Sequence, residues 1–149
     1  MRKRFLSALL AACLLLTAVC GAVPAMAEEM KNREEQPIRV DLTKMSAIMI
    51  YGLMYDIVSS PMEYEGQKMR LVGEYSSFKN PETGEMEHTI TFYDTSFCCH
   101  VDLRFYLKGD AVYPKDYPRD GSQMTVVGFL HVEGEGKKAT CWLEDGKLE

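Results

Sequence analysis

The chain has 149 residues, of which 46% are hydrophobic and 26% are charged, and its formal net charge at pH 7 is −5. A chain of this length fits one domain, whose core should be large enough to fold without a metal ion or a disulfide bond. Nucleic acids and anionic membranes attract basic surfaces, so the acidic balance argues against both as partners.

Residues 1–27 have the pattern of a secretory signal peptide. Residues 2–4 are basic, residues 5–23 form an uncharged apolar run, and A-M-A at residues 25–27 is a typical cleavage site. Cleavage would leave 14 basic and 22 acidic residues, a net charge of −8. We therefore expect an extracytoplasmic protein, either secreted or held in the periplasm or cell envelope, with no stable membrane span after cleavage.

Two of the five cysteines, Cys13 and Cys20, fall within the predicted signal peptide. Neither fits a lipid-attachment motif, because the apolar run before Cys13 is short and Cys20 lacks a small residue before it. Lipid anchoring is therefore less favoured than simple cleavage. Cys98, Cys99 and Cys141 remain, an odd number that predicts one disulfide and one free thiol in an oxidising compartment, or three free thiols in a reducing one.

A single helix is predicted at the start of the folded region. Residues 28–39 are charged and lack apolar periodicity, so we interpret them as a flexible linker that precedes a domain at residues 40–149. Apolar residues at helical spacing between Met45 and Ile57 predict the helix. The sequence S-S-P at residues 59–61 should end it, because proline cannot continue a helix.

The rest of the domain has the alternation and the turn residues of β structure. Five strands are predicted, at residues 67–75, 88–94, 97–107, 122–133 and 137–144. Gly73 and Gly128 lie inside the first and the fourth strand and should bend them. The expected fold is therefore mainly β, a small five-stranded barrel preceded by one helix.

The order of these elements resembles an OB-fold. Three segments also resemble an uncharacterised group of exported bacterial OB-like domains with a double-cysteine strand, namely S-P-M-E-Y-E-G-Q-K-M-R-L-V-G-E-Y, F-C-C-H and Y-P-R-D-G-S-Q-M-T-V-V-G. The chain is distantly similar to the periplasmic bacterial OB-fold family as well. The resemblance covers residues 45–143 and implies an extracytoplasmic binding module, and it implies no reaction.

Alternation along the third predicted strand assigns its reactive residues to two faces. Successive side chains on a strand point to opposite sides, so Cys99 should face the interior, while Cys98 and His100 share the outer face. In an OB-type topology the third strand lies beside the fifth, which carries Cys141. A Cys99–Cys141 disulfide is therefore the favoured pairing.

A metal site is the alternative use of the same residues. Thiolates and imidazoles bind zinc or copper, and Cys98, Cys99, His100 and Cys141 are the candidate ligands, with His131 as a substitute for Cys141. One ion could use both adjacent cysteines only if a bulge or a strand end turned them to one side. The sequence thus establishes no cofactor, and zinc, or copper in its place, is the metal that these residues would bind.

The aromatic residues supply the candidate binding surface. Tyr75, Tyr113, Tyr117 and Trp142 could together form a surface of the kind with which OB-folds bind sugars or peptides. His88 is interpreted as a surface residue of the second strand. No nucleophile, base and oxyanion site converge, so we expect no enzymatic activity.

The leading hypothesis is a non-enzymatic, exported OB-like module that binds a protein or saccharide partner near the connector at residues 113–117. The alternative is a metal-binding or thiol-redox envelope protein that uses the Cys98-Cys99-His100 cluster. The sequence does not indicate an oligomeric state.

Overall fold

The computed structural model describes residues 31–149, so the predicted signal peptide and the first residues of the predicted linker lie outside it. The described chain has two parts, residues 31–37 and 38–149. Residues 31–34 form a helical turn, where Lys31 and Glu35 make an ion pair of 4.0 Å. Between residues 31 and 149, no helix has the length and apolar character needed to cross a membrane.

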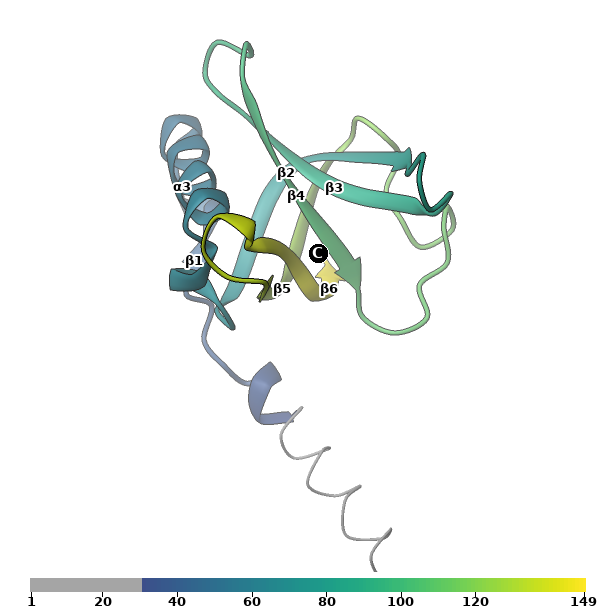
Figure 1. Cartoon of the computed structure of the whole chain (residues 1–149), viewed down its shortest axis with the longest axis horizontal. Helices are drawn as coiled ribbons and strands as arrows, with labels where there is room; N and C mark the ends of the chain where they lie inside the picture. The colour runs from purple at the N-terminus through teal and green to yellow at the C-terminus, as the bar shows by residue number, and fades with distance from the viewer. Residues whose placement is uncertain (1–30) are drawn as a thin grey trace, which may run out of the picture. The chain divides into compact units, whose positions relative to one another are not determined.

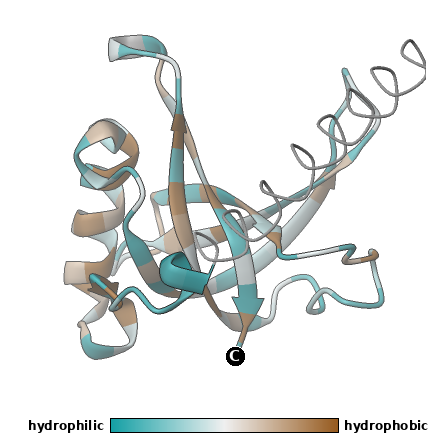
Figure 2. Ribbon diagram, turned by 90° about the horizontal axis from the view of Figure 1, so that it is seen from below, coloured by the Kyte–Doolittle hydropathy of each residue, from teal (hydrophilic) through white to brown (hydrophobic). Residues whose placement is uncertain are grey.

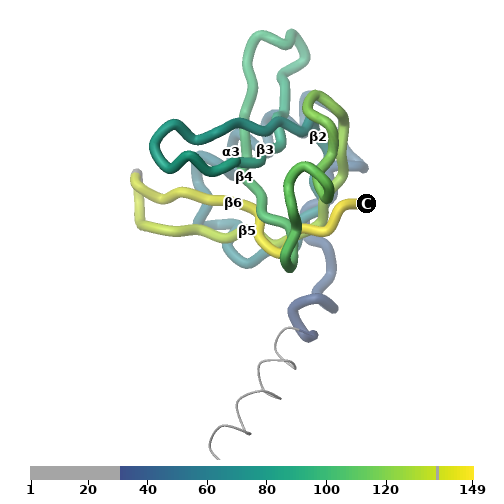
Figure 3. The backbone as a smooth tube through the Cα atoms, turned by 90° about the vertical axis from the view of Figure 1, so that its right-hand side faces the viewer, coloured from purple at the N-terminus to yellow at the C-terminus, as the bar shows by residue number. Residues whose placement is uncertain are grey.

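Residues 38–149 form a closed β-barrel. The strands are β1 (Val40–Asp41), β2 (Lys68–Lys79), β3 (Met86–Tyr93), β4 (His100–Leu107), β5 (Gln123–Glu133) and β6 (Thr140–Leu148). They follow one another in the order β1-β2-β3-β4-β6-β5, and β2 also pairs with β5, which closes the ring (Figure 1, Figure 3). The predicted fold, a mainly β, five-stranded OB-fold-like barrel with a preceding helix, is confirmed, and β1 is an additional strand.

The helical segments are short and lie at the margins of the barrel. They are η1 (Leu42–Lys44), α3 (Ala47–Ser59), η2 (Pro61–Tyr64) and η3 (Gly136–Lys138). The helix predicted between Met45 and Ile57 corresponds to α3, which packs against β3 and β4. Met54 and Ile57 are the residues of α3 that are fully buried, so one face of this helix completes the core.

Strand β2 belongs to both halves of the barrel. Residues 68–74 pair with β5, and residues 74–79 pair with β3. The strand changes partner next to Gly73, where an added Cβ would lie 2.5 Å from Cγ2 of Ile90 and 2.9 Å from the carbonyl oxygen of Thr91. The glycine is required because the strands approach too closely here for any side chain.

The core fills the barrel with side chains that alternate along its strands. Its fully buried members come from every strand of the closed barrel and include Met69, Leu71, Tyr75, Ile90, Leu103, Phe105, Val126, Leu130 and Leu143. On β4 the odd-numbered residues Val101, Leu103 and Phe105 face inward, as the alternation predicts. The parallel pairing of β4 with β6 likewise confirms that the third predicted strand lies beside the fifth.

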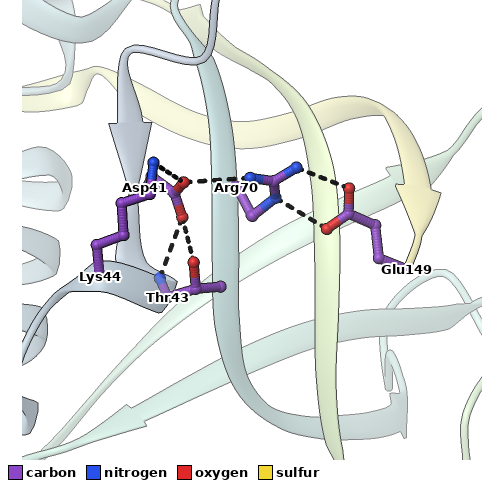
Figure 4. Close-up of polar contacts among 5 residues, drawn as sticks. All are labelled: Asp41, Thr43, Lys44, Arg70 and Glu149. Atoms are coloured by element: carbon purple, nitrogen blue, oxygen red, sulfur yellow. Dashed lines mark hydrogen bonds and ion pairs between the residues drawn. The ribbon is translucent and has the colours of Figure 1, made fainter.

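An ion-pair network joins β1 to the C-terminal end of the chain across β2 (Figure 4). Arg70 donates through Nη1 to Asp41 at 3.1 Å and through Nε to Glu149 at 2.8 Å. The Asp41 carboxylate also accepts from the hydroxyl of Thr43, which contributes most to a lowered pKa of about 2 for Asp41. The network therefore stays charged at neutral pH and ties the short β1 to the barrel.

Strand β4 begins three residues later than predicted. The strand was expected from Phe97, but Phe97 has a φ of 56°, which no strand residue adopts, and β4 starts at His100. The backbone amide of Asp94 donates to the carbonyl of Cys99 at 3.0 Å and closes a turn. Cys98 and Cys99 are both exposed in this turn, so the prediction that Cys99 faces the interior is wrong.

Gly128 provides a stability test of barrel closure. It lies at a register shift between β5 and β6, and an added Cβ would lie 2.6 Å from the carbonyl oxygen of Glu144 and 2.8 Å from Cγ of Leu143. We expect Gly128→Ala to lower the free energy of unfolding by about 1–3 kcal/mol, because the packed strands must separate. Chemical denaturation measures this change.

Gly52→Ala is the matched control for the same chemical substitution. Gly52 lies inside α3, and nothing lies within 4 Å of an added Cβ. Alanine favours helix over glycine, so we expect this variant to gain about 0.5–1 kcal/mol. Equal stability of Gly128→Ala and the wild type would contradict the role of Gly128 in closure.

Candidate functional site

A turn between β3 and β4 presents both cysteines on one exposed surface. The Asp94 carboxylate organises this turn, because its Oδ1 accepts from the backbone amides of Cys98 at 3.0 Å and Cys99 at 3.4 Å. Its Oδ2 accepts from the Ser96 hydroxyl at 2.7 Å and from the Cys98 thiol at 3.4 Å. One side chain thus fixes the backbone and also reaches a reactive sulfur.

The two thiols of the turn lie side by side. Sγ of Cys98 is 3.6 Å from Sγ of Cys99 and 3.2 Å from the Ser96 hydroxyl oxygen. The hydrogen bond with Cys98 is the main cause of a raised pKa for the Cys99 thiol, since it favours the protonated form. The Ser96 hydroxyl lowers the pKa of Asp94, which is therefore ionised at neutral pH.

Asp94, Cys98 and Cys99 are the residues whose arrangement could hold a metal ion. Their ligand atoms all lie within 4.8 Å of one another, and no other such group of three occurs among residues 31–149. The predicted ligand His100 instead faces Asp102, with Nε2 and Oδ2 3.4 Å apart. Cys141 pairs with Val132 in the ladder of β5 and β6 and does not belong to the group.

The predicted Cys99–Cys141 disulfide is absent, because Cys98, Cys99 and Cys141 are all free thiols. The pairing depended on an inward-facing Cys99, and the turn removes that condition. Cys141 is half-buried, and burial raises its thiol pKa. The sequence interpretation missed Asp94 as a site residue, although an aspartate followed by Thr95-Ser96 is a common beginning for a turn that side-chain hydrogen bonds stabilise.

Three of the four predicted partner-binding aromatics come together, in a row that runs from the buried Tyr75 through the partly buried Tyr117 to the exposed Tyr113. Tyr75 is 0% exposed, so it is a core residue and cannot line a surface. Its ring lies 6.3 Å from that of Tyr117, and the Tyr117 ring lies 6.0 Å from that of Tyr113. Trp142 lies apart from this group, with its ring 4.7 Å from His131 and 6.3 Å from Tyr106.

His88 is the unexpected member of the aromatic cluster. It is buried, with its ring stacked on Tyr117 at 3.8 Å and its Nδ1 2.8 Å from the Tyr75 hydroxyl, so its interpretation as a surface residue is wrong. His88 has the same strand parity as Ile90 and Phe92, and this signal could have revealed its inward position. Burial lowers the pKa of His88, and the charge of Asp120 partly opposes this shift.

Helix α3 has an apolar face that the barrel does not cover. Ile48, Met49 and Tyr55 are 69%, 58% and 60% exposed, and Val58 and Met62 are exposed near them at the C-terminal end of the helix. Figure 2 shows hydrophobic colour along most of α3. Asp56 is the one charged residue in the helix, and it accepts from the Tyr64 hydroxyl at 2.6 Å.

The turn with the two thiols lies next to this helix (Figure 1). The pKa of Tyr51 on α3 is raised by desolvation and then by the nearby charges of Cys99 and Asp94. Phe97, in the same turn, is 76% exposed. An apolar helix face and a dithiol turn are therefore neighbours on the surface of residues 38–149.

Comparisons of the chain with family models, with curated proteins and with solved structures found no match. The function is therefore inferred from the geometry of the turn, the aromatic cluster and the helix face.

The buried His88 predicts a loss of stability in mild acid. Its pKa is lowered in the folded state, so below about pH 6.5 the unfolded chain binds the proton more readily, and the free energy of unfolding falls with pH. His88→Gln removes this titration. Its stability relative to the wild type should therefore improve between about pH 8 and about pH 5.5, as thermal or chemical denaturation measures.

Other acidic groups titrate equally in both proteins and cancel in that difference. A difference between His88→Gln and the wild type that stays constant with pH would refute the assignment.

Proposed function

We propose that the protein is an exported, non-enzymatic OB-like binding module and that its partner is a protein, which docks on the uncovered face of α3. Export is inferred from the signal-peptide pattern of residues 1–27. The observation that carries the proposal is the exposure of large apolar side chains along one helix, with Ile48 and Tyr55 as its most exposed members on α3.

The composition of α3 supports a covered rather than a solvated helix. A surface helix normally has a polar face opposite its buried face, whereas a helix that is apolar on all sides is buried in its assembly. Residues 47–59 contain one charged side chain, and Met54 and Ile57 already fill the face toward the barrel. The opposite face therefore resembles the apolar centre of a protein–protein interface.

A protein partner fits this surface better than a saccharide. Sugar-binding sites combine exposed aromatic faces with several converging polar groups, whereas this surface is mainly aliphatic and thioether in character. Tyr75, from the predicted aromatic surface, is buried, and so is the His88 that stacks near it. The acidic net charge of −5 also disfavours an anionic lipid surface.

Site-specific photocrosslinking tests the docking face. A benzophenone amino acid replaces Tyr55 on α3, and in a parallel protein it replaces Tyr106 on β4, which is 50% exposed. In cells that express the protein at its native level, we expect a discrete polypeptide adduct from position 55 and none from position 106. The mass of the adduct distinguishes a second copy of the chain from another protein.

Two charged substitutions give the matched control. Ile48→Asp places a carboxylate at the first turn of α3, where the helix tolerates it, and should weaken the interaction at least about tenfold if this residue is central to the interface. Val112→Asp makes the same kind of change at an exposed site in the connector between β4 and β5 and should leave the adduct unchanged. Equal adducts at positions 55 and 106 would contradict docking on α3, and the absence of any polypeptide adduct from position 55 would contradict a protein partner on this face.

A further inference from the structure

We propose that Asp94, Cys98 and Cys99 form a zinc site of two thiolates and one carboxylate on the turn between β3 and β4. The proposal is independent of the docking face, because all three ligands belong to the turn. It replaces the ligand set that the sequence predicts, in which His100 and Cys141 accompany the two cysteines.

Two of the distances within the group are close to those of tetrahedral coordination, and all three ligand atoms lie within 4.8 Å of one another. Zinc–sulfur bonds of about 2.3 Å at a tetrahedral angle place two sulfurs about 3.8 Å apart, and a zinc–oxygen bond of about 2.0 Å places the oxygen about 3.5 Å from each sulfur. Sγ of Cys98 lies 3.6 Å from Sγ of Cys99 and 3.4 Å from Oδ2 of Asp94. The two thiols and the carboxylate could therefore share one ion with little movement.

Backbone amides hold the turn without using the ligand atoms, whereas the Ser96 hydroxyl contacts Oδ2 of Asp94 at 2.7 Å and Sγ of Cys98 at 3.2 Å and would rotate away when an ion binds. Oδ1 of Asp94 accepts from the amides of Cys98 and Cys99, and this leaves Oδ2 directed at the thiols. The amide of Phe97 donates to the Asp94 carbonyl at 3.2 Å and stabilises the reversal of the chain. Binding therefore requires little ordering of the backbone, which favours affinity.

The donor set favours zinc over other common ions. Two thiolates are too soft for magnesium or calcium, which bind oxygen ligands. The carboxylate is a hard ligand that suits divalent zinc better than copper(I), which prefers sulfur alone. Three protein ligands leave the fourth tetrahedral position for water or for a group from a bound partner.

Binding exchanges protons and needs no oxidant or reductant. Each thiol loses its proton when its sulfur bonds to the ion, so one zinc ion displaces two protons, while the Asp94 carboxylate is already ionised. The charges balance, because two thiolates neutralise the dication. The affinity for zinc should accordingly fall as the pH falls, since protons compete for both sulfurs.

Cobalt(II) substitution tests the site directly. In oxygen-free buffer with a phosphine reductant, the purified full chain should bind one Co²⁺ and show thiolate-to-cobalt absorption in the near ultraviolet, together with the intense visible bands of tetrahedral cobalt. Zinc should displace the cobalt and abolish these bands. Competition with a chromophoric chelator then gives the zinc affinity.

Substitutions identify the ligands. Removing a residue that only hydrogen-bonds to a metal ligand typically lowers metal affinity by about 10–100-fold. Removing a ligand itself should cost more, so Cys98→Ser and Cys99→Ser should each weaken zinc binding at least about a hundredfold. Asp94→Asn keeps an oxygen that can accept from the two amides but loses the anionic ligand, so it should weaken binding at least about tenfold. Both cysteines are exposed, so their substitution leaves the core intact.

The residues of the sequence-based set are the controls. Cys141→Ser and His100→Gln should bind cobalt and zinc as the wild type does, because neither side chain belongs to the group. Absence of stoichiometric cobalt binding by the reduced wild type would overturn the proposal. Loss of the cobalt bands in Cys141→Ser or His100→Gln, with their retention in Cys98→Ser, would overturn it too.

Discussion

The barrel depends on one constraint, the double pairing of β2. The strand bonds to β5 through residues 68–74 and to β3 through residues 74–79, so a single continuous strand carries the sheet around a corner. Such a corner is possible because Gly73 has no side chain, so atoms of Ile90 and Thr91 on β3 can occupy the space that a Cβ would take. Without this corner β2 would not pair with β5, so the sheet would stay open, with unpaired edges on β5 and on the first half of β2.

The position of the turn between β3 and β4 follows from this closure. Strand β3 pairs with the second half of β2. The chain must then reverse direction at the end of β3, because β4 runs antiparallel to it. The Asp94 side chain makes this reversal by accepting from two successive amides, and both cysteines are thereby turned away from the core. The barrel thus determines where the turn lies, and one carboxylate determines how its sulfurs are presented.

Much of the barrel could be predicted from the sequence, because alternation reports directly on burial. Val101, Leu103 and Phe105 face inward as expected, and the two glycines predicted to interrupt their strands lie where β2 changes partner and where β5 shifts its register against β6. The prediction is wrong at Cys99 because Phe97 and Cys99 extend the apolar alternation of β4, although both residues lie in the turn before the strand begins. Period alone contains no information on the positive φ of Phe97 or on the hydrogen bonds that Asp94 makes.

The burial of Tyr75 could not be predicted from the alternation of residues along its strand alone. Tyr75 was correctly expected on a strand, but whether a tyrosine faces solvent or core depends on which segment covers it, and here Tyr117 and His88 cover it from distant parts of the chain. Its burial raises the Tyr75 pKa to about 12, so the phenol stays protonated and can donate to the neutral imidazole of His88. Long-range packing of this kind leaves no pattern in the local sequence. The burial of His88, in contrast, could be predicted locally, because this histidine alternates in register with Ile90 and Phe92 on β3.

The helix face and the thiol turn are neighbours, but they are built from separate residues. The face consists of side chains on α3 and η2, and the turn obtains all its ligand atoms from residues 94–99. Tyr51 is the residue that connects them, since the charges of Cys99 and Asp94 act on it from across the boundary. Zinc binding replaces two thiol protons with a dication, so it leaves the net charge of the turn unchanged. The helix face and the turn therefore meet at Tyr51 but share no ligand atom, and either can be removed by substitution while the other is kept.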